Sequence, residues 1–84
     1  MSDIESLVRT MVTSIVDDEE SVSVAEAETD KEGRLLEVKV GKDDVGKVIG
    51  KQGRIASAIR TVAKAAGAKR GEKIMINVFN KPLE

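Results

Sequence analysis

The sequence predicts an α+β domain in which a three-stranded mixed sheet is covered on one face by helices, with the element order α-β-β-α-α-β. Apolar residues recur every three or four positions near both 3–17 and 54–66, as helices require. Between and after these segments they alternate in steps of two, which is typical of half-buried strands. Because 84 residues provide one hydrophobic core at most, we expect residues 1–84 to form a single domain.

The first helix is predicted at about residues 3–17. Ser2 and Glu5 have the spacing of a capping box at its start. The carboxylates from Asp17 to Glu20 are unfavourable near the negative end of a helix dipole, so we expect the helix to end near Asp17. Its apolar stripe consists of Ile4, Leu7, Val8, Met11, Val12, Ile15 and Val16.

A β-hairpin is predicted next, with strands at about residues 21–28 and 34–40. The turn-forming segment 29–33 separates the two strands, and Gly33 ends it. Leu36, Val38 and Val40 share one face of the second strand. Since Glu37 and Lys39 fall on the opposite face, we expect helices to cover only the first face.

The C-terminal half is predicted to contain two helices and a last strand. Asp43 or Asp44 is suited to cap a short helix that ends at the loop 50–53, and a longer helix follows at about 54–66. Gly67 lies where a left-handed C-terminal cap is common. The last strand is expected at about 72–79, and the helical crossover favours parallel pairing with strand 34–40.

Composition narrows the functional classes without deciding among them. The chain lacks cysteine and histidine, which argues against a structural zinc, and we expect neither cofactor nor metal. Residues 1–38 carry eleven acidic and three basic side chains, whereas residues 39–84 carry four and eleven, giving net charges of −8 and +7. Such asymmetry is a hint of a surface that faces a polyanion, and on charge alone two ordinary solvated faces explain it equally well. The first five residues resemble no signal peptide, so a cytoplasmic location is expected.

The segment Gly50-Lys51-Gln52-Gly53 is the strongest functional candidate. Two glycines around two polar residues let backbone amides approach a phosphate without obstruction by Cβ atoms. The following helix would add the positive end of its dipole, and Lys51 and Arg54 would add full charges. The segment is therefore predicted to bind an anion.

The run from Val45 to Ile55, VGKVIGKQGRI, resembles the signature of KH domains, whose GXXG loop clamps the nucleic-acid backbone. Size and element order make the chain similar to small bacterial type II KH proteins of the KhpA type. This resemblance implies single-stranded RNA binding and a role as RNA chaperone or post-transcriptional regulator, linked to cell shape and the cell wall. It also implies self-association and pairing with a larger KH-containing protein.

The resemblance implies an RNA site around the GXXG loop. Bases would lie in an apolar groove, for which Ile49 is the best candidate and Ile59 is equally well placed in the core. The resemblance also implies that Lys69 and Arg70 face the GXXG loop across this groove, although an ordinary exposed basic turn explains them equally well. The predicted RNA-binding residues are Val48, Ile49, Gly50, Lys51, Gln52, Gly53, Arg54, Lys69 and Arg70.

Three other interpretations are open at this stage. The glycines of the loop alone are equally compatible with a plain interhelical turn. Residues 41–48 approach the P-loop pattern, but Val48 replaces its hydroxyl residue, and no nucleophile and base are evident, so we expect no enzyme. A protein-protein adaptor would use the first helix or a patch of Leu35, Met75 and Phe79 instead of RNA.

Overall fold

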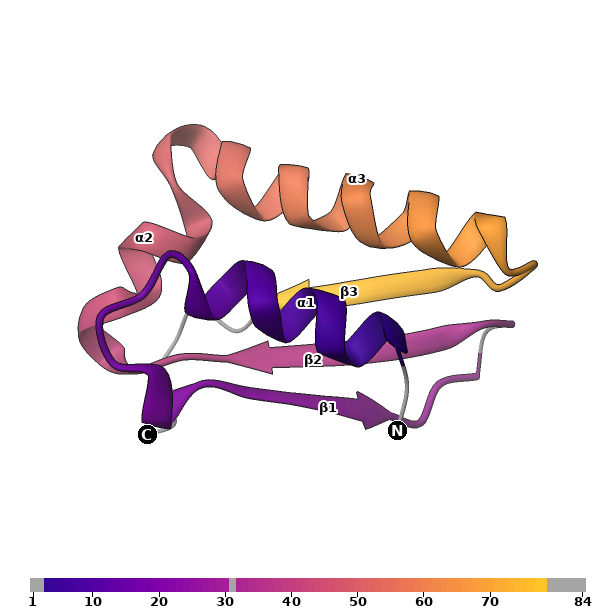
Figure 1. The fold of residues 1–84 in the computed structure, drawn as a ribbon, viewed down its shortest axis with the longest axis horizontal. Coiled ribbons are helices and arrows are strands. Elements are labelled where there is room, and N and C mark those ends of the chain that lie inside the picture. The colour runs from indigo at the N-terminus through magenta and orange to yellow at the C-terminus, as the bar shows by residue number, and fades with distance from the viewer. Residues whose placement is uncertain (1–2, 31, 79–84) are drawn as a thin grey trace.

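The computed structural model describes residues 3–30 and 32–78 and has the predicted element order and mixed sheet (Figure 1). Three one-turn 3₁₀ segments, η1 (Glu19–Ser21), η2 (Lys42–Asp44) and η3 (Lys51–Gly53), connect the longer elements. These longer elements are α1 (Asp3–Thr13), β1 (Ser23–Ala27), β2 (Arg34–Lys39), α2 (Val45–Ile49), α3 (Arg54–Lys69) and β3 (Ile74–Val78).

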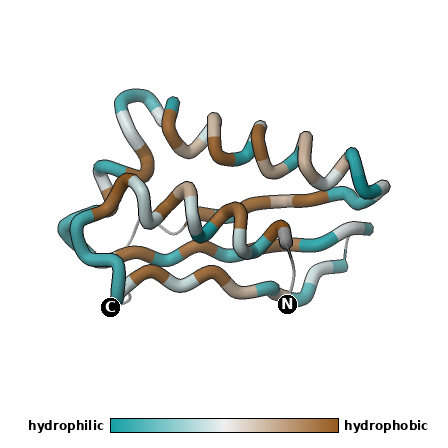
Figure 2. The backbone as a smooth tube through the Cα atoms, viewed as in Figure 1, coloured by the Kyte–Doolittle hydropathy of each residue, from teal (hydrophilic) through white to brown (hydrophobic). Residues whose placement is uncertain are grey.

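The sheet has the strand order β1-β2-β3. β1 pairs with β2 in antiparallel fashion, placing Val24 opposite Val38, and β2 pairs with β3 in parallel, placing Leu36 beside Ile76. The parallel pair confirms the predicted crossover through two helices. Apolar residues alternate with polar ones along the strands, as the colours of Figure 2 show. The buried apolar residues of the strands and the helices form one core cluster.

The core lies between this face of the sheet and helices α1 and α3. Leu36 and Val38 from the centre of the sheet are fully buried, and Ala63 of α3 packs above them in the same cluster. Small side chains on α3 let that helix approach the sheet closely. From α1, the buried residues are Ile4, Val8 and Val12, which confirms the predicted apolar stripe.

Helix α1 ends at Thr13, four residues before the predicted end. The carbonyl of Thr10 accepts hydrogen bonds from both the amide and the hydroxyl of Ser14. The amide of Ile15 bonds to the carbonyl of Val12, a tighter turn than an α-helix makes. The dipole argument placed the end of the helix too late. The hydroxyl groups of Thr13 and Ser14 both donate hydrogen bonds to the carbonyl of Thr10 and so compete with the helix hydrogen bonds one turn earlier.

Helix α3 continues through Gly67 to Lys69, so the prediction that Gly67 ends it is wrong. Gly67 is buried, and a Cβ atom there would lie 2.3 Å from Cγ1 of Ile74 and 2.9 Å from the carbonyl oxygen of Glu72. The glycine is thus required by the close approach of α3 to the start of β3. Gly71, with φ +74°, is the residue that turns the chain after the helix.

Some predictions concern residues that the structure does not describe. Ser2 of the capping box and Phe79 of the proposed adaptor patch lie outside the described residues. Within residues 3–30 and 32–78, no helix is both long enough and apolar enough to cross a membrane.

Candidate nucleic-acid interface

The loop between α2 and α3 has an unusual backbone. Gly50 has φ 73° and ψ 176°, and Gln52 and Gly53 both adopt left-handed conformations, with φ values of 58° and 73°. The Gly50 conformation is accessible essentially to glycine alone. These torsion angles bring the chain out of α2, around one tight turn and into α3 within four residues.

The two glycines of this loop have different surroundings. A Cβ atom at Gly50 would lie 2.5 Å from Cγ1 and 2.9 Å from Cβ of Ile55, so the loop crosses closely over the first turn of α3. A Cβ atom at Gly53 would meet nothing within 4 Å. Gly50 is therefore required by both torsion angle and space, whereas Gly53 is required by its torsion angle only.

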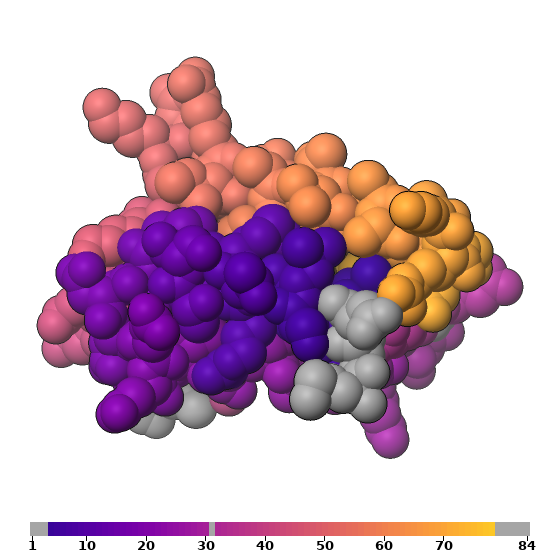
Figure 3. All heavy atoms as spheres, viewed as in Figure 1, coloured from indigo at the N-terminus to yellow at the C-terminus, as the bar shows by residue number. Residues whose placement is uncertain are grey.

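The polar side chains of the loop are exposed and project beyond the rest of the molecule, at the upper left of Figure 3. Nη2 of Arg54 donates a hydrogen bond to Oε1 of Gln52 at 3.2 Å. No side chain caps the first turn of α3 at Gly53, so the positive end of a 16-residue helix opens beside Lys51 and Arg54. The arrangement combines two cations with an open helix N-terminus, which suits a phosphate.

The apolar residues around the loop divide between surface and core. Val48 is fully buried, so its side chain does not line a groove, and this part of the prediction is corrected. Its side chain belongs to the hydrophobic core cluster between the helices and the sheet. Ile59 is also a core residue, at 3 % exposure. Ile49 and Ile55 are half-buried at the edge of the core and remain accessible beside the loop.

Lys69 and Arg70 lie at the opposite end of α3 from the GXXG loop (Figure 1). A helix of 16 residues spans about 24 Å, so the two basic segments do not face one another across a groove. The prediction of their placement is therefore wrong. It rested on the family resemblance, whereas the full length of α3 separates this turn from Gly50.

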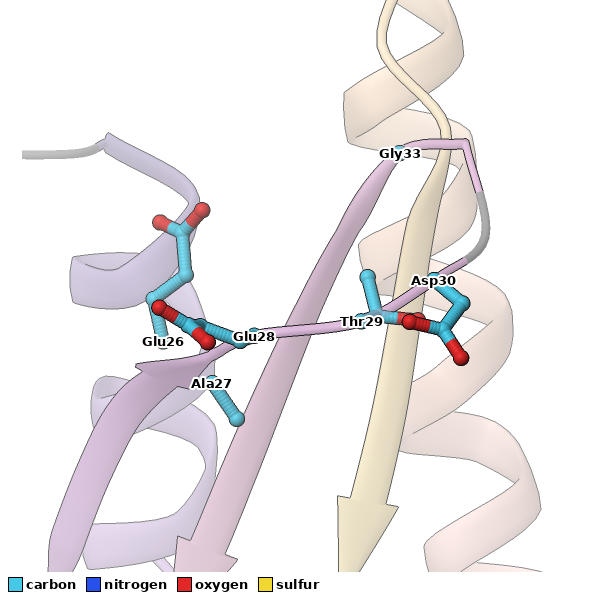
Figure 4. A pocket seen from close by; sticks show the side chains of 6 residues that line it. All are labelled: Glu26, Ala27, Glu28, Thr29, Asp30 and Gly33. Carbon is cyan, nitrogen blue, oxygen red and sulfur yellow. The ribbon is translucent and has the colours of Figure 1, made fainter.

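The far end of the sheet is acidic. Figure 4 shows a pocket at the connection between β1 and β2, lined by side chains that include Glu26, Glu28 and Asp30. Arg34 makes 3.0 Å ion pairs with Glu26 and with Glu72, and these two carboxylates raise the pKa of the guanidinium. Carboxylates repel phosphates, so this pocket is not a site for a polyanion.

Arg60 was not among the predicted site residues. It lies on α3, and its Nε donates a 3.1 Å hydrogen bond to the carbonyl oxygen of Ile76 on β3, which ties the helix to the edge of the sheet. The sequence contains a weak signal for this role, because Arg60 is four residues after Ala56 and three before Ala63, on the side of α3 that faces inward.

Asp44 has an unexpected environment. It was predicted as a helix cap, yet its side chain makes no capping bond to α2. It is 2 % exposed, and its carboxylate accepts hydrogen bonds from the amides of Asp17, at 3.2 Å, and Asp18, at 3.0 Å. Hydrogen bonds from the amides of Asp18 and Asp17, together with the charge of Lys47, hold the pKa of Asp44 below its ordinary value.

Lys47 completes this group. Its Nζ lies 3.4 Å from Oδ1 of Asp44 and also pairs with the carboxylate of Asp17. The two carboxylates, that of Asp17 first, raise the pKa of Lys47. Across the described residues 3–30 and 32–78, no group of three or more metal-ligating side chains has an arrangement suited to an ion.

Comparison with known proteins identifies relatives along most of the chain. The family model described as "KhpA/KhpB, KH domain" matches residues 5–78. The RNA-binding protein KhpA of Clostridium perfringens is 48 % identical over 75 residues, which cover 89 % of this chain and 99 % of that protein. KhpA of Bacillus subtilis is 43 % identical over 77 residues, covering 92 % and 94 %.

Among solved structures, the Aquifex aeolicus protein Era, crystallised as its Y63A variant with GDP.AlF4⁻, has a similar fold. The TM-score is 0.67 at 18 % sequence identity. The match covers 90 % of this chain but only 29 % of the Era chain. At this identity the similarity concerns the fold alone.

Proposed function

Because the chain belongs to the KhpA/KhpB family of KH-domain proteins, we propose that it binds single-stranded RNA through a phosphate clamp at Gly50–Arg54. The observation that carries this proposal is the geometry of the GXXG loop. Its backbone needs glycine, its side chains are exposed and cationic, and it opens at the uncapped N-terminus of α3. Curated relatives are named RNA-binding proteins, and their family is not an enzyme family.

In this proposal each loop residue has a defined task. Gly50 and Gly53 allow the backbone amides to approach phosphates, and Lys51 and Arg54 supply positive charge. Gln52 contacts the sugar-phosphate backbone, oriented by its bond to Arg54. Ile49 and Ile55 provide an apolar surface for one or two bases. Phe79 is the one aromatic residue in the sequence, so stacking adds little and the affinity is modest.

Family resemblance supports the wider parts of the proposal. These are a cytoplasmic role as RNA chaperone or post-transcriptional regulator, connected with cell shape and the cell wall, and association with a second copy or a larger KH-containing protein. An adaptor that acts through α1 is less well supported, because Ile4, Val8 and Val12 of its apolar stripe are buried in the domain's own core.

The test is the double substitution of Lys51 and Gln52 by aspartate. Both side chains are exposed, and aspartate tolerates the left-handed conformation at position 52 better than most residues. We therefore expect stability within about 0.5 kcal/mol of the parent protein. RNA affinity should collapse, because one positive charge is lost and two negative charges meet the phosphates.

The measurement is fluorescence anisotropy with a short labelled single-stranded RNA, with thermal melting as a control for folding. For the parent, two to four phosphate contacts predict a slope of log K against log salt of about −1.4 to −2.8. A folded double variant that binds as tightly as the parent would refute the clamp.

A further inference from the structure

Helix α2, which leads into the GXXG loop, is too short to hold its own position. It has five residues, Val45–Ile49, and isolated helices need about 12 to 15 residues to be even marginally stable in water. The side chain of its N-cap residue, Asp44, makes no capping hydrogen bond to its first turn. Its apolar contacts with the core come from Val48, which is fully buried, and from the half-buried Ile49. The orientation of this helix therefore depends on contacts with other segments.

The carboxylate of Asp44 supplies a contact of this kind, with a segment 26 to 27 residues away in the sequence. Oδ1 accepts the amide of Asp17 and Oδ2 accepts the amide of Asp18. Since the side chain of Asp44 is 3 % exposed, water does not compete effectively for these bonds. The turn after α1 is thereby joined to the residue immediately before α2.

Lys47 joins the same two segments one turn further along α2. It pairs with the carboxylates of Asp44 and Asp17, so the buried charge of Asp44 has a cationic partner. A buried carboxylate with two amide donors and a lysine is fully satisfied, which makes its position well defined. The adjacent Asp43 is exposed and takes no part in this group.

The anchored end of α2 is connected rigidly to the loop. Asp44 directly precedes α2, whose five residues span about 7.5 Å. The amide of Gly50 closes this helix with a 2.9 Å hydrogen bond to the carbonyl of Gly46. A tilt of α2 at Asp44 would therefore displace Gly50, which crosses so closely over Ile55 that a Cβ atom there would lie 2.5 Å from Cγ1 of Ile55.

From these contacts we propose that Asp44 is a positioning residue for the GXXG loop. It fixes α2 against the turn after α1 and so holds Gly50 and Lys51 in the conformation that receives a phosphate. This inference rests on the proposed RNA clamp for its functional meaning, but the effect on the loop is measurable without RNA.

The test uses Asp44→Asn, which keeps the shape of the side chain. The amide offers one acceptor oxygen where the carboxylate offers two, and its NH₂ group opposes one of the backbone N–H donors. One of the two bonds to the turn is lost, together with the charge that faces Lys47. Asp43→Asn is the matched control, since it removes the same charge from an exposed neighbouring position.

Two readouts are compared among the parent, D44N and D43N: hydrogen exchange of individual amides and anisotropy with a short labelled single-stranded RNA. In D44N we expect the Gly50 amide to exchange faster while the amides between β2 and β3 keep their protection. If about one D44N molecule in ten has the loop in the RNA-binding conformation, the apparent Kd for RNA rises about tenfold. D43N should match the parent in both measurements.

Two results would overturn the proposal. Equal Gly50 exchange in D44N and D43N would show that Asp44 does not hold the loop. Uniformly faster exchange, including the β2–β3 amides, would show that it supports only the stability of the whole domain. Absence of RNA binding by the parent would refute the proposed function, whereas the comparison of Gly50 exchange would still decide the positioning role.

Discussion

Helix α3 has a basic, glycine-containing turn at each end, and the two turns differ in what surrounds them. At its N-terminus, Lys51 and Arg54 belong to a loop whose nearest buried carboxylate, that of Asp44, is already paired with Lys47. At its C-terminus, Lys69 and Arg70 precede Glu72, which pairs with Arg34 beside the acidic β1–β2 connection. Similar sequences therefore lie in opposite electrostatic surroundings.

The backbones of the two turns also differ. The first places Gly50 in a conformation essentially restricted to glycine and opens the positive end of α3 to solvent. The second closes the negative end, where the carbonyl of Gly67 accepts the amides of Arg70 and Glu72. An anion is favoured at the first turn and disfavoured at the second by the same helix dipole. Basic residues identify a phosphate site only when the backbone and the neighbouring carboxylates agree with them.

The largest expected effect comes from replacing the closely packed glycine near each end of α3, which is Gly50 in the first turn and Gly67 within the helix itself. Gly50→Ala should cost about 1–3 kcal/mol in backbone strain, with further cost from the contact with Ile55, and should abolish RNA binding. Gly67→Ala should cost about 1–3 kcal/mol by overpacking against Ile74. Thermal melting and RNA titration of the folded fraction measure both effects.

The two glycine substitutions should differ in their effect on RNA affinity. Folded Gly67→Ala protein should bind RNA like the parent, because the substituted position lies near the far end of α3. If G67A lowers affinity as much as G50A, both ends of the helix take part in binding and the comparison fails.

A smaller effect is expected from charge reversal at each turn. Lys51→Glu should weaken RNA binding about tenfold, equivalent to about 1.4 kcal/mol, and should make the salt slope shallower by about 0.7 for each lost phosphate contact. Lys69→Glu should change affinity by less than about twofold, since its distance from the loop exceeds the Debye length of about 8 Å at physiological salt. Anisotropy titrations at several salt concentrations decide between them, and a larger effect at Lys69 would contradict the assignment.

The smallest expected effect is a change with pH in the stability that Asp44 contributes to the fold beside the first turn. The folded protein lowers the pKa of Asp44 through the amides of Asp18 and Asp17 and the ammonium of Lys47. The ionised carboxylate therefore stabilises the fold above the unfolded value of about 3.9, and this contribution disappears as the pH falls through the lower folded pKa. Melting curves should show that the stability difference between the parent and D44N narrows below about pH 4. A difference that stays constant would indicate that the charge of Asp44 contributes nothing.

The sequence alone was sufficient for the features that depend on neighbouring residues. The spacing of Val8 and Val12 identified the buried side of α1, and the alternation of Leu36 and Val38 identified the inner face of β2. The GXXG loop was located because its glycines meet a local torsional requirement. Side-chain periodicity and backbone torsion are properties of short segments, so they can be predicted without knowledge of how the segments pack.

Other features depended on residues that meet only in the folded chain. Gly67 has the local setting of a helix cap, and only its contact with Ile74 shows why the helix continues past it. The same is true of Val48, which turns inward because the core lies beneath α2. Asp44 looked like a cap for the next helix, but its carboxylate binds amides 26 and 27 residues earlier. The sequence alone could not predict that choice of donors, because packing of α1 against α3 and the sheet brings those amides to the carboxylate and keeps water away from them.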